Sequence, residues 1–193
     1  MKDILLVFSQ MLKYPDGQFF DHLDQLKLLV DSFDNPQLSS LTADIYGYFK
    51  EYSVYGLEEL YSQTFDWNPR NCLYAGYYLF GESYFRSSFL SNLLDNFKEH
   101  AYPYLDNELP DHFSILLDFS AKCLTGPDRK KFIESVVVTA LDKFLNLSVK
   151  EEDETDEPKK IAFSTVKPYY NLIQLLFQFL SSYMSEQIII TTM

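Results

Sequence analysis

An all-helical, single-domain bundle is the fold that this sequence predicts. Apolar residues recur at the three- and four-residue spacing of a helix face along almost the whole chain, glycines and prolines separate these periodic segments, and no segment makes a convincing sheet. The 193 residues are 47% hydrophobic and 23% charged, which is ordinary globular composition and enough chain for one sizeable core. We expect about eight to nine helices, as in other all-α domains.

The first third of the chain contains three predicted helices. The spacing of apolar residues places them at about Leu5–Leu12, Phe19–Val30 and Gln37–Tyr52. Turn-forming sequences at 14–17 and 34–36 separate them. Gly56 is expected to end the third helix, because glycine is a poor helix former.

The middle of the chain opens with a stripe of apolar residues at positions i, i+3, i+4, i+7 and i+8, namely Leu57, Leu60, Tyr61, Thr64 and Phe65. Asn68 before Pro69 is typical of a helix start, so we expect a helix from there through Phe80. Gly76 inside this helix costs roughly 1 kcal/mol relative to alanine. That cost favours a close crossing with another helix at Gly76.

Glycine and capping residues set the expected boundaries of the next elements. Gly81 should end or bend the helix that precedes it, and Ser83 should cap a helix that runs to about His100. The connection after His100 holds two prolines and is expected to be a structured loop. Asp111 should then cap a helix over 113–124.

The last third of the chain contains two long predicted helices. Gly126–Pro127 is expected to end the helix before it, and a long helix then covers Phe132–Leu145. The last helix covers Tyr169–Met184, and residues 187–193 either fray or add a short strand. The segment 150–160 holds six acids and three lysines, which is typical of a flexible linker. We therefore divide the one domain into a core at 1–149, an acidic linker at 150–160 and a C-terminal helix at 161–193 that packs on the core.

The net charge of −12 limits the kinds of partner. The acidic linker contributes −3, so −9 is spread over the rest of the fold. Nucleic acids and anionic membranes both require basic patches, so we expect the protein to bind neither. Acidity instead favours solubility and attraction of basic partners.

The chain is expected to be cytoplasmic and not an integral membrane protein. No stretch approaches the roughly 18 to 20 apolar residues of a membrane span. The apolar run Ile4–Phe8 is too short for a secretory signal. Cys72 and Cys123 are far apart and form no CxxC motif, which favours two buried free thiols.

Signatures of catalysis are absent from the sequence. It contains no GxSxG elbow, phosphate-binding loop, GxGxxG or HExxH motif. His22, His100 and His112 lie on different predicted elements, and none has a partner at metal-ligand spacing. A structural hydrogen bond at a helix start is the favoured role of His112. We therefore expect a protein that is not an enzyme and needs no cofactor.

Aromatic and acidic residues concentrate between Leu57 and Phe119, and two interpretations stay open on periodicity alone. One is an ordinary core with capping residues. The other is a groove with an apolar floor and an acidic rim, which would suit an amphipathic peptide helix carrying lysine or arginine.

Four short motifs, in this order, resemble the NarJ branch of the TorD/DmsD/NarJ family of molybdoenzyme assembly chaperones. They are Leu12–Asp16 (LKYPD), Tyr61–Asp66 (YSQTFD), Phe80–Ser83 (FGES) followed by Arg86, and Glu108–Phe113 (ELPDHF). The resemblance covers roughly the first two-thirds of the chain in matching order, including the acidic linker and late helix that such proteins often carry.

The resemblance implies an all-helical cytoplasmic chaperone without catalytic activity. Such a chaperone binds the apo catalytic subunit of a molybdopterin oxidoreductase of the nitrate or dimethyl sulfoxide reductase type, often at its N-terminal leader or remnant twin-arginine peptide. It supports insertion of the molybdenum cofactor before export or membrane attachment. The residues that match the family motifs, and are therefore the candidate client-binding residues, are Tyr61, Phe65, Asp66, Glu82, Arg86, Leu109, Pro110, Asp111 and His112.

These nine residues divide by physical role. Glu82 and Arg86 have the spacing of a structural ion pair on one helix, and Leu109–Pro110 is expected to set loop geometry. The better candidates for peptide contact are Asp66, Asp111 and His112, with Tyr61 and Phe65.

Two other functions and two oligomeric states remain. A permanent helical adaptor or regulatory subunit of an oxidoreductase complex is the alternative function, while the missing phosphate loop argues against a nucleotide-dependent enzyme. The protein is expected to be a monomer, or a dimer in which the last helix is exchanged across the linker.

Overall fold

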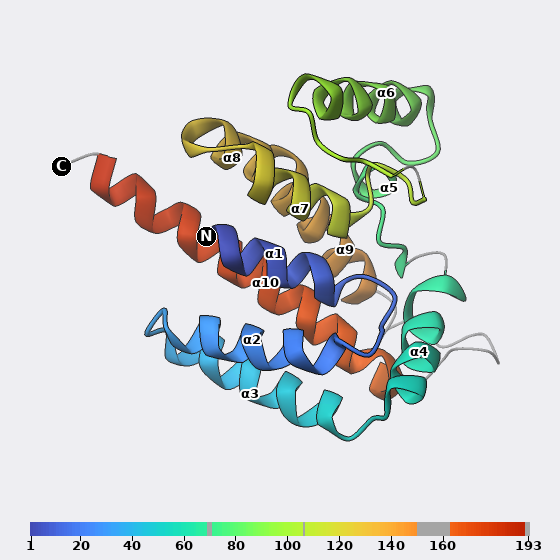
Figure 1. The fold of residues 1–193 in the computed structure, drawn as a ribbon, viewed down its shortest axis with the longest axis vertical. Coiled ribbons are helices and arrows are strands. Elements are labelled where there is room, and N and C mark those ends of the chain that lie inside the picture. The colour runs from blue at the N-terminus through green and yellow to red at the C-terminus, as the bar shows by residue number, and fades with distance from the viewer. Residues whose placement is uncertain (69–70, 106, 150–162, 192–193) are drawn as a thin grey trace.

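The computed structural model describes residues 1–68, 71–105, 107–149 and 163–191, and Figure 1 shows their arrangement. Every regular element in these ranges is a helix, and the described residues contain no strand beyond an isolated antiparallel bridge between Tyr74 and His112. The predicted all-α class is confirmed. Counting uninterrupted helical runs once each, the described residues form nine helices.

The first three helices pack in chain order, the second against both the first and the third. They are α1 (Lys2–Met11), α2 (Phe19–Asp31) and α3 (Pro36–Lys50). The side-chain oxygen of Asn35 accepts hydrogen bonds from the N–H groups of Gln37 and Leu38, and Pro36 takes the first helical position. The helix packs against α2 and against the last helix of the chain.

α4 (Val54–Tyr61) continues without interruption into the π-helical turn η1 (Ser62–Asp66). Its N-cap is Ser53, whose hydroxyl accepts a hydrogen bond from the N–H of Gly56. The prediction that Gly56 ends the third helix is therefore wrong, because that helix ends at Lys50 and Gly56 lies inside the next one.

α5 (Ala75–Phe80) is shorter than the sequence predicts. Tyr74 precedes it with extended backbone, and residues 73–75 pair with residues 111–113 at the start of a later helix. Pro69 lies outside the described residues. Two predictions at glycines are confirmed. Gly81 ends α5 with a φ of +64°, and Gly76 is the site of a close helix approach.

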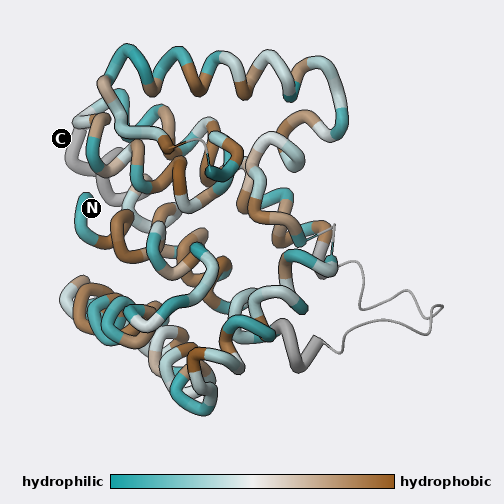
Figure 2. The backbone as a smooth tube through the Cα atoms, turned by 45° about the vertical axis from the view of Figure 1, so that its right-hand side comes forward, coloured by the Kyte–Doolittle hydropathy of each residue, from teal (hydrophilic) through white to brown (hydrophobic). Residues whose placement is uncertain are grey.

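α6 (Tyr84–Glu99) lies along one edge of the molecule with α5 as its principal helical neighbour, and its alternating hydrophilic and hydrophobic segments are visible in Figure 2. Ser83 is its N-cap residue, as predicted, although its hydroxyl donates to the carbonyl of Phe80 and caps no N–H group of α6. A loop then leads to α7 (Phe113–Cys123), whose main partner is α1.

The next helical run combines α8 (Gly126–Phe132), the π-helical segment η3 (Ile133–Val138) and α9 (Thr139–Val149). Gly126 and Pro127 open α8 and do not end α7, which already stops at Cys123, so that boundary prediction is wrong. Proline is well tolerated there because the N–H groups of the first turn have no acceptor within the helix. The N–H that proline lacks would have made no helical hydrogen bond.

α10 (Phe163–Thr191) crosses the molecule from end to end (Figure 1). It packs on α3, η1, η3, α9 and α4, and buries Tyr169, Leu172, Ile173, Leu176 and Leu180 completely. The helix extends to Thr191, so the tail is helical and forms no strand as far as that residue. The predicted acidic linker lies outside the described residues.

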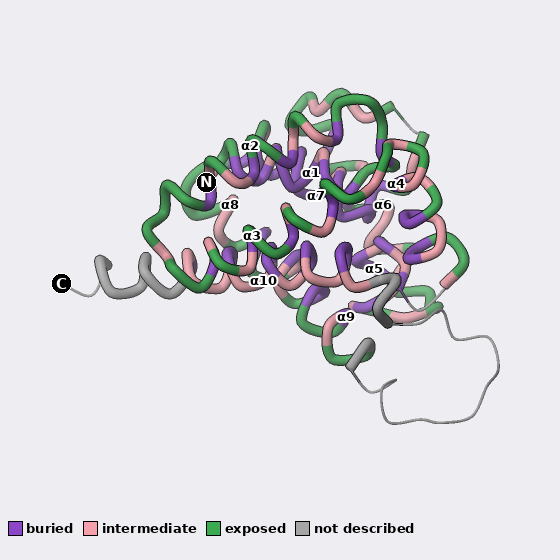
Figure 3. Tube along the Cα trace, turned by 90° about the horizontal axis from the view of Figure 1, so that it is seen from below, coloured by how far each residue is buried: buried purple, intermediate pink, exposed green. Residues whose placement is uncertain are grey.

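The core runs along the inward faces of these helices, where buried residues gather in Figure 3. Among the helices of the described ranges, none combines the length and apolar character that crossing a bilayer requires. Cys72 and Cys123 are free thiols, as predicted, but the prediction that they are buried is wrong, because both are only partly buried.

Candidate functional site

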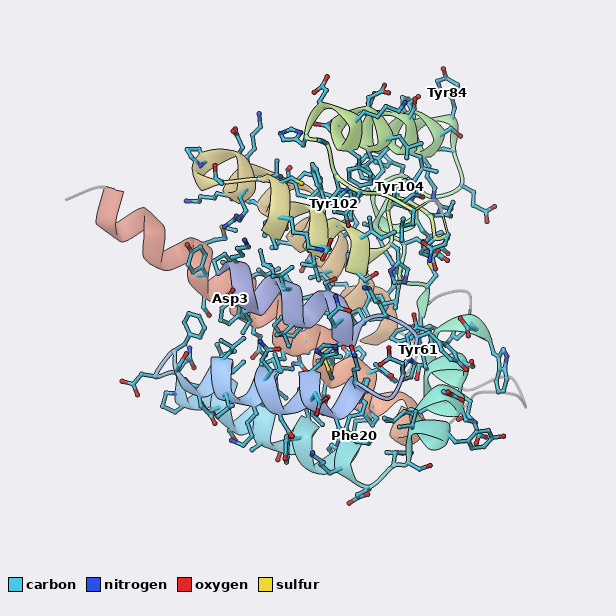
Figure 4. The ribbon with its side chains drawn as sticks, in the orientation of Figure 1. Asp3, Phe20, Tyr61, Tyr84, Tyr102 and Tyr104 are labelled. Atoms are coloured by element: carbon cyan, nitrogen blue, oxygen red, sulfur yellow. The ribbon has the colours of Figure 1, made fainter. Side chains whose placement is uncertain are left out.

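A groove of about 960 Å³ lies where three parts of the chain meet. One wall comes from the loop after α1 and from the end of α4 with η1. The other wall comes from the loop before α7 and from α7 itself, and the segment 72–74 lies between the two. Figure 4 shows Tyr61 on the α4 side and Tyr102 and Tyr104 on the side of α6 and α7.

Aromatic rings build the floor on the α4 side. Tyr61 and Phe65 meet edge to face with ring centroids 5.0 Å apart, and Tyr14 packs against Tyr61 at 5.4 Å. Behind them lies Tyr169 of α10, at 5.6 Å from Tyr61 and 5.2 Å from Phe65. The Tyr61 hydroxyl donates to the carbonyl of Leu12, which holds the loop after α1 in place. The floor is therefore well packed on its inner side.

The opposite wall is held by hydrogen bonds from tyrosines. Tyr102 donates to the Asp118 carboxylate at 2.8 Å, and Tyr74 donates to the Glu108 carboxylate at 2.9 Å. Tyr104 donates to the backbone carbonyl of Glu108. Burial and the neighbouring carboxylates raise the pKa of Tyr74 and of Tyr102, so both hydroxyls stay protonated donors.

The charges around the groove have mixed sign. Asp66, Glu108 and Asp118 line it together with Lys13 and Lys122. Lys122 forms an ion pair with Asp118 at 2.9 Å, which neutralises one of the three acids. A uniformly acidic rim, one of the two interpretations of the sequence, is not what these lining residues form.

Asp111 lies outside the groove lining and is fully buried. Its Oδ2 accepts hydrogen bonds from the N–H of Gly76 at 3.1 Å and from the Arg86 guanidinium at 3.3 Å. A β-carbon at position 76 would lie 2.6 Å from that oxygen, so glycine is required for the contact. Burial raises the pKa of Asp111, against the opposing effects of Arg86 and the Gly76 N–H. The carboxylate thus fastens α5 and α6 to the start of α7.

Two sequence predictions about these residues are wrong. Arg86 pairs with Asp111 and not with Glu82, because Glu82 lies exposed before the start of α6 and shares no helix with Arg86. Asp111 does not cap α7 either. The cap is His112, since the carboxylate of Asp111 is already engaged by Gly76 and Arg86.

His112 has the structural role that the sequence favoured. Its Nδ1 accepts a hydrogen bond from the N–H of Ser114 at 3.2 Å, and its ring packs edge to face against Tyr74 at 5.5 Å. Burial lowers the pKa of His112 to about 4. The ring is therefore neutral near pH 7, while it also forms part of the groove lining.

The structure brings four of the nine predicted residues to the groove: Tyr61, Phe65, Asp66 and His112. The other five, Glu82, Arg86, Leu109, Pro110 and Asp111, do not line it. Pro110 is buried, and the carbonyl of Leu109 accepts from the N–H of His112, in keeping with a role in loop geometry. Which of the nine contact a client stays a prediction.

Sequence reasoning missed four of the six tyrosine and phenylalanine residues that line the groove, namely Tyr14, Tyr74, Tyr102 and Tyr104. Tyr14 belongs to the LKYPD motif, but nothing in that motif marks it as a lining residue. The one signal was the excess of aromatic residues, with 15 tyrosines and 17 phenylalanines in the chain.

A metal centre finds no support in the part of the chain that the structure describes. No three histidine, cysteine, aspartate or glutamate side chains gather there in a way that could hold an ion.

Comparison with known proteins adds one relative and no family model. No family model matches the chain. It is 28% identical over 113 residues to a protein of Bacillus subtilis (strain 168) described as a probable nitrate reductase molybdenum cofactor assembly chaperone, NarJ. The match spans 58% of this chain and 61% of the relative's length. The chain is therefore similar to a NarJ assembly chaperone over somewhat more than half of its length.

Proposed function

We propose that this protein is an assembly chaperone for a molybdoenzyme and that it binds the apo catalytic subunit through the groove. The client is an oxidoreductase of the nitrate or dimethyl sulfoxide reductase type, held in the cytoplasm at its N-terminal leader or remnant twin-arginine peptide while the molybdenum cofactor is inserted. The observation that carries the proposal is an aromatic groove on an all-helical chain similar to NarJ.

The size of the groove suits a short peptide helix. A helix with its side chains is roughly 10–12 Å across and rises about 5.4 Å per turn. A volume of about 960 Å³ therefore accommodates about two turns of helix. The aromatic rings supply apolar contact area, and the fixed tyrosine hydroxyls orient polar atoms of the client.

Binding and release, without bond chemistry, are what these residues support. His112 is neutral and occupied as a helix cap, and the carboxylates of Glu108 and Asp118 accept from tyrosines. The relative's description as a chaperone agrees with the expectation that the chain is not an enzyme.

The proposal is tested by affinity capture with the apo catalytic subunit and, separately, with the mature enzyme. We expect wild-type protein to bind the apo-subunit alone, and Tyr14→Ala and Asp66→Ala to weaken binding about tenfold, or about 1.4 kcal/mol. Tyr84→Ala is the matched control, because Tyr84 is 81% exposed on α6, away from the groove lining.

Each of the other results has a defined meaning. Equal retention by the mature enzyme would replace the chaperone with a permanent adaptor subunit. Absence of binding to either form would overturn the proposed function.

A further inference from the structure

The outer face of α4 and η1 is exposed in a way that packing does not explain. The inner face buries Leu57, Leu60, Tyr61, Thr64 and Phe65. On the opposite side, Tyr55 is 77% exposed and Trp67 is 65% exposed. α4 lies at one end of the molecule in Figure 1, where its principal contacts are with η1 and α10. Nothing in the described residues covers the outer face.

The charged residues of this stretch of chain are all acidic, unlike those of the groove. Residues 51–68 include Glu51, Glu58, Glu59 and Asp66, and contain no lysine, arginine or histidine. Glu59 accepts a hydrogen bond from Gln63 at 3.0 Å, and Asp66 is exposed. Within the described ranges, no lysine or arginine forms an ion pair with any of the four acids.

Aromatic and acidic groups on this face are arranged along one line. Tyr55, Glu59, Gln63 and Trp67 follow one another at intervals of four residues, which places them on one side of a helical surface. Exposed tryptophan and tyrosine beside carboxylates form the chemical pattern that recognises arginine and lysine. The ring faces attract the cation, and the carboxylates pair with it.

The outer face is continuous with the groove through η1. Phe65 and Asp66 line the groove, and Trp67 follows them directly in the chain. The groove lining and the outer face therefore meet at the end of η1.

We propose that the outer face of α4–η1, defined by Tyr55, Glu59, Asp66 and Trp67, binds a basic segment of the client. This segment adjoins the apolar segment that occupies the groove, so the inference rests on the proposed function. The groove selects for apolar content, and the outer face selects for adjacent lysine or arginine. The four acids of residues 51–68 repel nucleic acid and anionic membranes.

The first experiment uses Trp67 as the reporter, because it is the single tryptophan of the chain. Wild-type protein is titrated with a tryptophan-free synthetic peptide that carries the N-terminal residues of the apo catalytic subunit. We expect Trp67 emission to shift to shorter wavelength and its quenching by acrylamide to fall on binding. A second peptide, with every arginine and lysine replaced by glutamine, should bind about tenfold more weakly and leave the emission unshifted.

The second experiment uses variants of the outer face, with binding measured by calorimetry at low and moderate salt. Glu59→Gln and Tyr55→Ala should each weaken binding of the basic peptide several-fold and reduce its salt dependence, but should leave binding of the glutamine peptide unchanged. Glu99→Gln and Tyr84→Ala are matched controls, because they make the same changes at exposed positions of α6.

The possible results separate this inference from the proposed function. If the apo-subunit binds, Tyr14→Ala weakens that binding, and Glu59→Gln and Tyr55→Ala leave it unchanged, the inference fails and the chaperone stands. If neither peptide nor apo-subunit binds, the proposed function fails. If the protein alone forms a dimer that Glu59→Gln dissociates, the face binds a second copy, whose basic residues on α8 at 129–131 would be the partner, and the inference is again overturned.

Discussion

Asp111 connects three helices with one carboxylate. It is fully buried, and its Oδ2 takes hydrogen bonds from Gly76 at the start of α5 and from Arg86 on α6. A buried charge is stable only when it is paired and hydrogen-bonded, so this position depends on both partners at once. The absence of a β-carbon at Gly76 is what lets the carboxylate approach.

Replacing Gly76 by alanine should destabilise the protein by about 2 kcal/mol, because the added carbon would lie 2.6 Å from the Asp111 oxygen. The control is Gly47→Ala in α3, where nothing lies within 4 Å of the added carbon. That change should stabilise the protein by up to about 1 kcal/mol, since alanine is the better helix former. Urea denaturation measures both, and equal effects at the two glycines would contradict the assigned contact.

His112 should make stability depend on pH. Its pKa is about 4 in the folded protein and 6.5 when unperturbed, because burial disfavours the charged ring. The contribution of the neutral His112 ring to the free energy of unfolding is fully present above pH 6.5 and is lost as the pH falls towards 4. The loss amounts to about 3 kcal/mol at most.

Urea midpoints between pH 4 and 7.5 test this expectation. His112→Asn is the comparison variant, because asparagine can also accept the capping hydrogen bond but does not titrate. Wild-type protein should lose more stability than the variant on acidification. Parallel pH profiles for the two would show that His112 does not have the lowered pKa.

At the scale of elements, the loop that forms one groove wall starts from a strained residue. Ala101 follows α6 with a φ of 51°, and the N–H of Tyr102 donates back to the carbonyl of Phe97. This is the left-handed helix end that glycine normally occupies, because a side chain there costs roughly 1–2 kcal/mol.

Ala101→Gly should therefore stabilise the folded protein by about 1 kcal/mol. Asp34→Gly is the matched change at the other described non-glycine residue with positive φ, also 51°. Its gain should be smaller, because aspartate tolerates this conformation better than alanine. Thermal unfolding compares the two, and a destabilised Ala101→Gly would contradict the strain.

Local patterns predicted the elements better than their ends. Apolar spacing located the helices, and Gly81 and the Gly76 crossing followed from glycine chemistry. The predictions at Gly56 and at Gly126–Pro127 were wrong because glycine and proline also occur inside or at the start of a helix. Ser53 caps α4 and thereby places Gly56 inside that helix. Leu73 and Tyr74 stay outside α5 because they pair with 111–113, a segment that lies far along the chain.

At the scale of the whole molecule, α10 supports the groove from behind. Tyr169 packs on Tyr61, Phe65 and Phe49, and its hydroxyl is buried without a hydrogen-bond partner. In the site, as in the fold, contacts between residues far apart in the chain could not be predicted from local patterns. The ion pair between Arg86 and Asp111 joins residues 25 positions apart, which no periodicity or capping rule anticipates.

Tyr169→Phe should leave stability unchanged or raise it by about 1 kcal/mol, because the variant removes a buried hydroxyl that has no partner. Tyr169→Ala should cost about 3–5 kcal/mol through the cavity left behind. In calorimetric titration with the client peptide, the Phe variant should bind like wild type and the Ala variant more weakly. Lost stability in Tyr169→Phe would reveal a partner for the hydroxyl.

The support from Tyr169 also sets an order in time during synthesis. Ribosomes deliver Phe65 well before Tyr169, and at roughly 5–20 residues per second the interval is roughly 5–20 s. Until α10 has been made and docked, the rings of Tyr61 and Phe65 have no backing. A growing chain whose translation has not passed this helix therefore has no finished groove, and the proposed capture of a client would have to wait for α10.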